Sequence, residues 1–216
     1  MARVTGLLVT FSGVDGSGKS TLAHALIEEL ASEGVPTEYL WWFAANDSFL
    51  GKVAGSVVQK IAKPEEDEAK GSPKVGLARA LYQLLVLVDF LLRVWYSLIL
   101  GKNIVCDRYI YDIVVFFATE LRYSESEAQK LVRLLKSITP KPLVAFLVDV
   151  PARIAMQRKS DIPSSQRHER LRKLYLDLAK GDSTVTFVDG SKGLEELNQA
   201  IFTQVCSRLS RITKHR

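Results

Sequence analysis

The stretch Gly13-Val-Asp-Gly-Ser-Gly-Lys-Ser20, followed by Thr21, lies between an apolar run at 7–11 and leucines at helical spacing over 22–30. It matches the spacing G-x-x-x-x-G-K-[ST] in full, which is the spacing of loops that wrap nucleotide phosphates. Glycines let backbone N–H groups turn inward onto a phosphate chain, and the N-terminus of the following helix adds partial positive charge. Lys19 is predicted to reach the β- and γ-phosphates. The stretch therefore predicts binding of a nucleoside triphosphate by Gly13, Asp15, Gly16, Ser17, Gly18, Lys19, Ser20 and Thr21.

Apolar runs and helical patterns alternate along the rest of the chain. Strands are expected at 7–11, 37–42, 104–107, 143–148 and 185–188. Helices are expected at 22–33, 47–61, 75–100, 112–121, 125–138, 151–158, 166–180 and 194–211. Unbroken apolar strands are typical of parallel strands covered on both faces, and parallel strands need covering crossovers. The pattern predicts one doubly wound, three-layer α/β domain over residues 1–216, with a five-stranded parallel sheet and ligands at the carboxyl ends of its strands.

Composition excludes several classes of protein. The chain has 216 residues, 47% hydrophobic and 25% charged, with two cysteines. These values exclude wholesale disorder, a collagen-like chain and a disulfide scaffold. The net charge of +5 suits a polyanionic partner, without separating nucleic acid from a nucleotide. The apolar stretch 75–100 contains Arg79, Asp89 and Arg93, so a buried or subunit-contacting helix is favoured over a membrane span. With no secretory pattern at the N-terminus, we expect a soluble cytoplasmic protein.

Two further groups of charged residues favour a kinase among the proteins with such a loop. Asp107-Arg108-Tyr109 stands at the end of the third strand, beside the loop if the strand order is the usual one. Asp107 could hold Mg²⁺ through water, with the Ser20 hydroxyl completing its shell, and Arg108 could bridge phosphates; the alternative is a surface ion pair. Six basic residues crowd one segment: Arg158, Lys159, Arg167, Arg170, Arg172 and Lys173. Such a run is ordinarily a solvated face, but beside a phosphate loop it indicates a mobile lid over about 158–172.

The chain resembles the thymidylate kinases. The resemblance rests on 13–21, 107–109, 147–158 and 172–179, in the right order and spacing. It implies transfer of the γ-phosphoryl group of ATP to thymidine 5′-monophosphate (dTMP), with Mg²⁺, by a homodimer formed through helices that include 75–100. It also implies that Asp15 faces the acceptor's sugar, that Arg108 bridges the donor and acceptor phosphates, and that Arg158 packs on adenine.

The resemblance also implies where the catalytic arginines lie. Gly16 stands where one type of family member carries an arginine, so the lid must supply them. Arg172 is the best-placed candidate relative to Tyr175, and Arg170 is another. The expected catalytic residues are Lys19, Arg108, Arg167 and Arg172.

Departures from the family pattern all fall on the acceptor side. An arginine-glutamate-proline-glycine element is replaced by Trp41-Trp-Phe-Ala-Ala-Asn-Asp47, and an aspartate-arginine pair by Asp89-Phe90 with Arg93. A serine is replaced by Asp112, and an alanine-tyrosine-glutamine by Val115-Phe-Phe117. The aromatic residues could stack on a base or pack in the core, and Asp89 with Arg93 could simply pair across one helical turn. The expected acceptor-binding residues are Asp15, Trp42, Phe43, Arg79, Arg93, Arg108 and Tyr109.

Two other functions remain open on the sequence alone. Because the acceptor-side residues differ, the acceptor could be another nucleotide, a nucleoside or a sugar. The chain could also be a regulatory or nucleic-acid-associated module that binds ATP without transferring phosphate. No basic-aromatic repeat accompanies the +5 charge, so we expect small nucleotide substrates and no nucleic acid.

Overall fold

The computed structural model describes residues 6–41, 73–121, 123–160, 162 and 164–214. Within these ranges, the side chains of 73–83, 86, 120–121 and 212–214 are not described.

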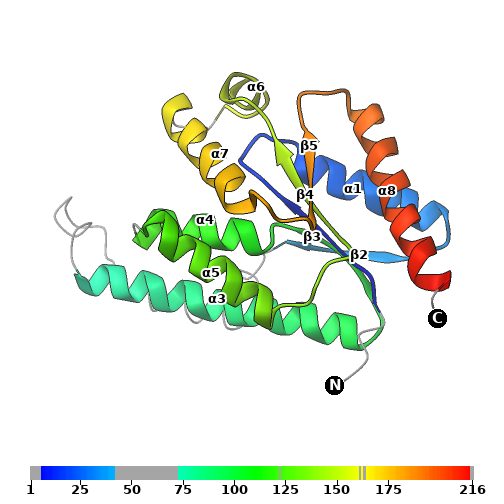
Figure 1. Cartoon of the computed structure of the whole chain (residues 1–216), viewed down its shortest axis with the longest axis horizontal. Coiled ribbons are helices and arrows are strands. Elements are labelled where there is room, and N and C mark those ends of the chain that lie inside the picture. The colour runs from blue at the N-terminus through cyan, green and yellow to red at the C-terminus, as the bar shows by residue number, and fades with distance from the viewer. Residues whose placement is uncertain (1–5, 42–72, 122, 161, 163, 215–216) are drawn as a thin grey trace.

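One five-stranded parallel sheet forms the middle layer (Figure 1). Its strands are β1 (Leu8–Ser12), β2 (Thr37–Trp41), β3 (Asn103–Asp107), β4 (Val144–Asp149) and β5 (Val185–Asp189), in the order β2-β3-β1-β4-β5. Both neighbours of β1 come from distant parts of the chain, with Phe11 opposite Asp107 and Ser12 opposite Leu147. The expected α/β class, the parallel sheet and the position of Asp107 beside the phosphate loop are therefore confirmed.

Helices cover both faces of the sheet (Figure 1). They are α1 (Lys19–Ser32), α3 (Pro73–Ile99), α4 (Ile110–Leu121), α5 (Glu125–Ile138), α6 (Ala152–Arg158), α7 (Ser165–Ala179) and α8 (Leu194–Lys214). One buried cluster joins the sheet to α3, α4, α5 and α7, and a second joins it to α1 and α8. Residues alternate between the clusters along β1, since Leu8 belongs to the first, and Val9 and Phe11 to the second. The period-2 alternation of a strand thus builds two cores on one sheet.

Helix boundaries follow the local signals in the sequence. The first helix ends before Gly34, which has φ 75°, and the N–H groups of Gly34 and Val35 donate to the carbonyls of Ala31 and Leu30. Pro151 precedes the first residue of α6. The expected helix 47–61 lies outside the described residues. In the part of the chain that the structure describes, no helix is long and apolar enough to cross a membrane.

Candidate active site

The phosphate loop has a backbone that only glycine tolerates at two positions. Gly13 has φ 144°, and a Cβ atom there would lie 2.4 Å from the carbonyl oxygen of Val148. Gly16 has φ 77°, and its Cβ would lie 2.7 Å from the carbonyl oxygen of Ala155. The loop is therefore pressed against the end of β4 and against α6, in a conformation that side chains would disrupt.

Lys19, the first residue of α1, is buried beneath this loop. Its Nζ donates a hydrogen bond to the carbonyl of Val14 over 3.0 Å and lies 3.7 Å from a carboxylate oxygen of Asp15. Burial lowers its pKa to about 8, and the positive charge of Arg108 acts in the same direction. The lysine is thus a poorly solvated cation held against the loop, and a bound phosphate would stabilise its charged form.

Arg108 faces the loop from the neighbouring strand. Its Nη2 lies 2.5 Å from Oδ1 of Asp15, and Lys159 approaches the other oxygen of that carboxylate at 3.9 Å. Partial burial raises the pKa of Asp15, but the charges of Arg108 and Lys19 outweigh it, and the net pKa lies below its usual value. Cations from the turn after β3, from α1 and from the start of the expected lid segment thus meet at one carboxylate of the phosphate loop.

The two residues expected to hold Mg²⁺, Asp107 at the end of β3 and Ser20 in the first turn of α1, both contact the hydroxyl of Tyr39. Asp107 is buried; its Oδ2 accepts a hydrogen bond from the Tyr39 hydroxyl over 2.8 Å, and its Oδ1 has no hydrogen-bond partner among the described residues. The same phenol interacts with Ser20. The described residues hold no group of three or more potential ligands from His, Cys, Asp and Glu. Mg²⁺ is usually bound by one or two protein groups together with substrate phosphates and water, so a carboxylate oxygen without a partner fits this ion.

Arg158 ends α6 beside the same loop. Its Nη1 donates to the carbonyl of Gly190 over 2.8 Å and would lie 3.7 Å from a Cβ atom at Gly18. The guanidinium therefore lies between the phosphate loop and the segment after β5.

The two arginines of α7 that are expected to be catalytic differ in their surroundings. Arg167 lines two hollows of about 190 Å³ each, and Asp15 lines both. Arg172 makes a bidentate pair with Asp149, over 2.6 and 2.8 Å, and lies 3.2 Å from Glu169. Glu169 also accepts a hydrogen bond from the backbone N–H of Ala152. The structure thus places Arg167 near the phosphate loop, whereas Arg172 braces α7 against the end of β4.

The expected acceptor-binding residues are only partly brought together. Arg108 and Asp15 meet, as described above. Tyr109 is buried, and its hydroxyl donates to the carbonyl of Pro140 over 2.8 Å, so this side chain belongs to the core. Arg93 pairs with Asp89 over 2.9 Å, which was the alternative interpretation of their spacing. Trp42 and Phe43 lie outside the described residues, and Arg79 lies on α3 with its side chain not described.

Two buried residues of the site were not among the catalytic or binding residues expected from the sequence, although Asp112 was noted there as a departure from the family pattern. Asp112 is 2% exposed and contacts the phosphate loop, Arg108 and α7. His168 of α7 is 3% exposed, with Nε2 3.2 Å from the backbone oxygen of Asp15. A single carboxylate within the apolar run 110–117 was a usable signal for the first. Nothing in the basic run of α7 distinguished His168 from its neighbours.

Basic side chains thus converge on the phosphate loop from several elements that are distant along the chain. Phosphoryl transfer needs this arrangement, because its catalysis is mostly positioning and neutralisation of charge on the transferring group. The parallel sheet and this site define a phosphate-loop kinase of the nucleotide kinase type.

Comparison with known proteins identifies the family. The thymidylate kinase family model matches residues 11–201, so the chain belongs to the thymidylate kinase family. It is 26% identical over 202 residues to the thymidylate kinase of Fervidobacterium nodosum, covering 90% of this chain and 96% of that protein. It is 28% identical over 204 residues to the thymidylate kinase of Leptospira borgpetersenii, covering 89% and 90%. A probable thymidylate kinase of Archaeoglobus fulgidus is 27% identical over 201 residues, covering 90% and 92%.

Proposed function

We propose that this protein transfers the γ-phosphoryl group of ATP to dTMP and releases dTDP and ADP. Membership of the thymidylate kinase family supports the acceptor. The contact between Arg108 and Asp15 supports the chemistry, because it holds a cation at the loop where the donor's phosphates would bind. No covalent intermediate is needed, since bringing two phosphates together with their charge neutralised is sufficient.

Each basic residue has a separate part in this proposal. The phosphate loop binds the β- and γ-phosphates through backbone N–H groups and Lys19, and Arg108 bridges the two substrates. Arg167 adds positive charge from α7. Ser20 and Asp107 would hold a Mg²⁺ ion, which when bound neutralises charge on the donor's phosphates. Arg158 would pack on adenine at the edge of the loop.

Turnover with a panel of acceptors tests the proposed function. ADP release is measured by a coupled assay with dTMP, dUMP, the other nucleoside monophosphates, thymidine and simple sugars. We expect the highest kcat/KM with dTMP, and dTDP as the product found by chromatography. The panel is needed because Val115 and Phe116 line the hollow beside Arg108, at positions where the sequence departs from the family. Turnover of another acceptor with none of dTMP would replace dTMP in the proposal.

We further propose that the chain acts in the cytoplasm as a homodimer formed through α3. Large apolar side chains are exposed along this helix at helical spacing. They are Leu84, Leu85, Val88, Leu92, Tyr96 and Ile99. An apolar stripe of this kind on a helix is typical of a surface that another subunit covers.

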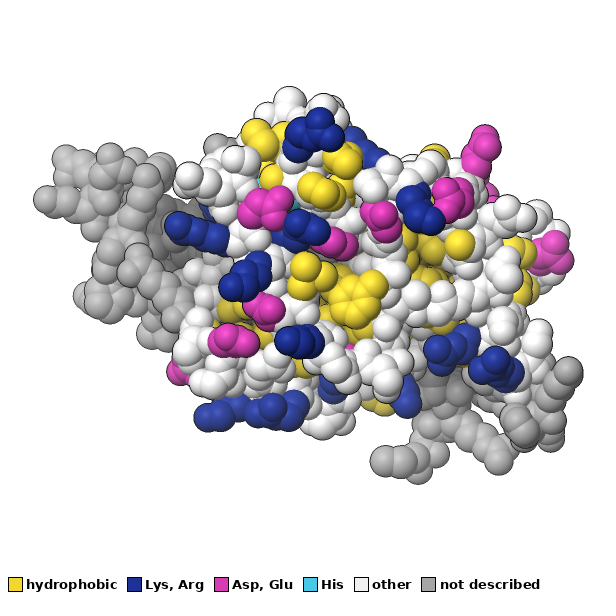
Figure 2. Space-filling model, turned by 45° about the horizontal axis from the view of Figure 1, so that its top comes forward, with side chains coloured by type: hydrophobic (Ala, Val, Ile, Leu, Met, Phe, Trp, Pro, Cys, Tyr) yellow, Lys and Arg dark blue, Asp and Glu magenta, His cyan; other side chains and the backbone are white. Residues whose placement is uncertain are grey.

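Small nucleotides rather than nucleic acid are the proposed partners. On the face that carries α6 and α7, Lys and Arg side chains are interspersed with Asp and Glu (Figure 2). A binding surface for a polyanionic polymer would instead gather basic side chains into a stripe. Binding of oligonucleotides that is strong and salt-sensitive, without phosphoryl transfer, would contradict this proposal.

A further inference from the structure

We propose that Asp112 is a positioning residue that fixes the bridging arginine Arg108 relative to both the phosphate loop and α7. This inference rests on the proposed function, in which Arg108 contacts the reacting phosphates. It assigns a role in that reaction to a buried carboxylate that lines the hollow beside Arg108 and acts through the arginine.

The carboxylate of Asp112 accepts hydrogen bonds from three separate parts of the fold. Its Oδ1 lies 3.4 Å from the backbone nitrogen of Gly13, 3.4 Å from Nη1 of Arg108 and 2.9 Å from the hydroxyl of Tyr175. Its Oδ2 accepts from the backbone N–H of Tyr109 over 3.1 Å. The phosphate loop, the β3–α4 turn and α7 therefore share one anchor.

The backbone of Arg108 is held on both sides by this arrangement. Arg108 has φ 81°, an unfavourable value for a residue with a side chain. Its own N–H donates to the carbonyl of Phe11 over 2.8 Å, and the next N–H, that of Tyr109, donates to Asp112. Such a conformation persists only where the surroundings over-determine it. The aspartate thus fixes both the backbone and the guanidinium of the bridging residue.

The two carboxylates that contact Arg108 differ in burial. The side chain of Asp15 is 51% exposed, whereas that of Asp112 is fully buried. When substrates bind, phosphate oxygens can replace the exposed carboxylate of Asp15 as a partner of Arg108. Water cannot replace the buried carboxylate of Asp112. We therefore assign to Asp112 the contact with Arg108 that persists when substrates bind, and to Asp15 the contact that is exchanged for phosphate oxygens.

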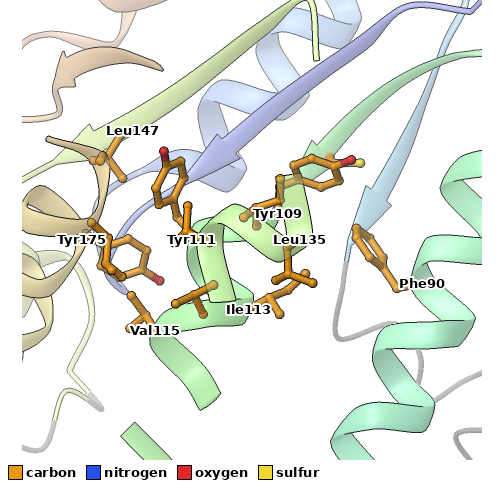
Figure 3. Close-up of a cluster of buried hydrophobic side chains, with 14 of the residues drawn as sticks. Phe90, Tyr109, Tyr111, Ile113, Val115, Leu135, Leu147 and Tyr175 are labelled. Atoms are coloured by element: carbon orange, nitrogen blue, oxygen red, sulfur yellow. The ribbon is translucent and has the colours of Figure 1, made fainter. Parts of the chain in front are cut away.

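Tyr175 connects this anchor to the helix that carries Arg167. It reaches from α7 toward Val115 on α4 within the buried cluster (Figure 3), and its hydroxyl donates to Asp112. Burial raises its pKa well above the usual value, with the neighbouring carboxylate adding to the effect, so the phenol stays protonated and donates. The bridging arginine and the α7 arginine are thereby positioned from the same carboxylate.

Asp112→Asn tests the role directly. The amide keeps the volume, removes the charge and leaves at least one of the four donors without its acceptor. We expect kcat to fall about 10- to 100-fold, as misplacement of a reacting group does, with the KM for ATP changed less than about threefold. Tyr175→Phe leaves the carboxylate in place and removes one hydrogen bond, so a smaller fall in kcat is expected. In the double variant the two effects should not add, because both act through one anchor.

Asp182→Asn is the matched control. Asp182 also accepts from a tyrosine of α4 and a cation, Tyr111 and Lys136, but contacts no residue of the phosphate loop described above. We expect this variant to lower the melting temperature and leave kcat unchanged. If Asp112→Asn behaves in the same way, its role is structural and the inference is wrong. If Asp112→Asn does not fold, an unchanged kcat in Tyr175→Phe overturns the inference.

Two further measurements separate this inference from the proposed function. Wild-type turnover of dTMP is measured first, and its absence contradicts the proposed function alone; the variants are then compared on whichever acceptor turns over. Arg108→Ala is measured beside them. If kcat survives this substitution, there is no bridging arginine to position, and the inference is wrong.

Discussion

At the scale of single residues, the charge state of Lys19 links the buried site to pH. In the unfolded chain the lysine keeps its proton up to about pH 10.5, whereas in the folded, unliganded protein it releases it near pH 8. The unfolded state therefore binds more protons between these values, and the contribution of Lys19 to the free energy of unfolding rises with pH across that window. The lysine is thus less costly to bury when neutral, yet it is needed in its charged form to bind phosphates.

ATP binding should consequently weaken above about pH 8. Because bound phosphates favour the charged lysine, binding at higher pH must take up a proton, and affinity should fall by up to about tenfold per pH unit. Calorimetric titrations at pH 7.5, 8.5 and 9.5, in buffers of different ionisation enthalpy, measure both the affinity and the proton uptake. Lys19→Ala should bind ATP weakly without this proton uptake and should abolish phosphoryl transfer. Equal uptake in the wild type and the variant would exclude Lys19 as its source.

At the scale of elements, the phosphate loop and α6 are packed too closely for a side chain at Gly16. Gly16→Ala combines an unfavourable positive φ with a contact of 2.7 Å to the carbonyl oxygen of Ala155. We expect a loss of about 2 kcal/mol in the free energy of unfolding and weaker ATP binding, because the loop must move. Denaturant unfolding and ATP titration measure the two effects.

Gly181→Ala provides the control for this substitution. Gly181 has nearly the same φ, 78°, but a Cβ there meets nothing within 4 Å. It should therefore cost only about 1 kcal/mol, the penalty of the left-handed backbone alone, and leave ATP binding unchanged. Equal losses in both variants would mean that the contact with α6 contributes nothing.

The clamp between α7 and β4 distinguishes two roles for Arg172. Asp149→Ala and Arg172→Ala both break the bidentate pair, and each should lower the free energy of unfolding by about 1 kcal/mol, since the pair is partly exposed. Only Arg172→Ala removes the positive charge of the guanidinium. If Arg172 is catalytic, as we predict from the sequence, kcat falls at least tenfold in Arg172→Ala and much less in Asp149→Ala. Similar values of kcat in the two variants would assign Arg172 to the clamp alone.

At the scale of the whole molecule, the exposed side of α3 is the proposed subunit interface. Leu92 is 60% exposed there. Leu92→Glu would place a charge within a buried apolar interface, so we expect the protein to become monomeric. Light scattering coupled to size-exclusion chromatography measures the mass. Leu134→Glu on α5, where the leucine is 56% exposed, is the control and should leave the dimer unchanged. A wild-type protein that is monomeric at all concentrations would contradict the interface.

Much of this molecule could be predicted from local patterns. Apolar runs and leucine periodicity locate every described strand and helix to within about three residues, because a strand or helix needs its apolar side chains at a fixed period. The loop at 13–20 predicts the triphosphate site, since its conformation depends on glycines that are local in the chain. Asp107 and Arg108 lie beside that loop because β3 is the neighbour of β1 in the sheet. This is the usual strand order for proteins with such a loop, so the motif allowed the position to be predicted.

The amino-acid sequence alone identifies the class of protein, a parallel α/β kinase with a phosphate loop, and the family to which it belongs. Which charged side chains act together depends on how the chain folds. Arg167 and Arg172 lie five residues apart on one helix, yet one lines the site and the other binds Asp149. Asp112 gains its four donors from segments up to 99 residues away in sequence. Hydrogen bonds and ion pairs between distant segments depend on packing geometry, and no local pattern in the chain encodes it.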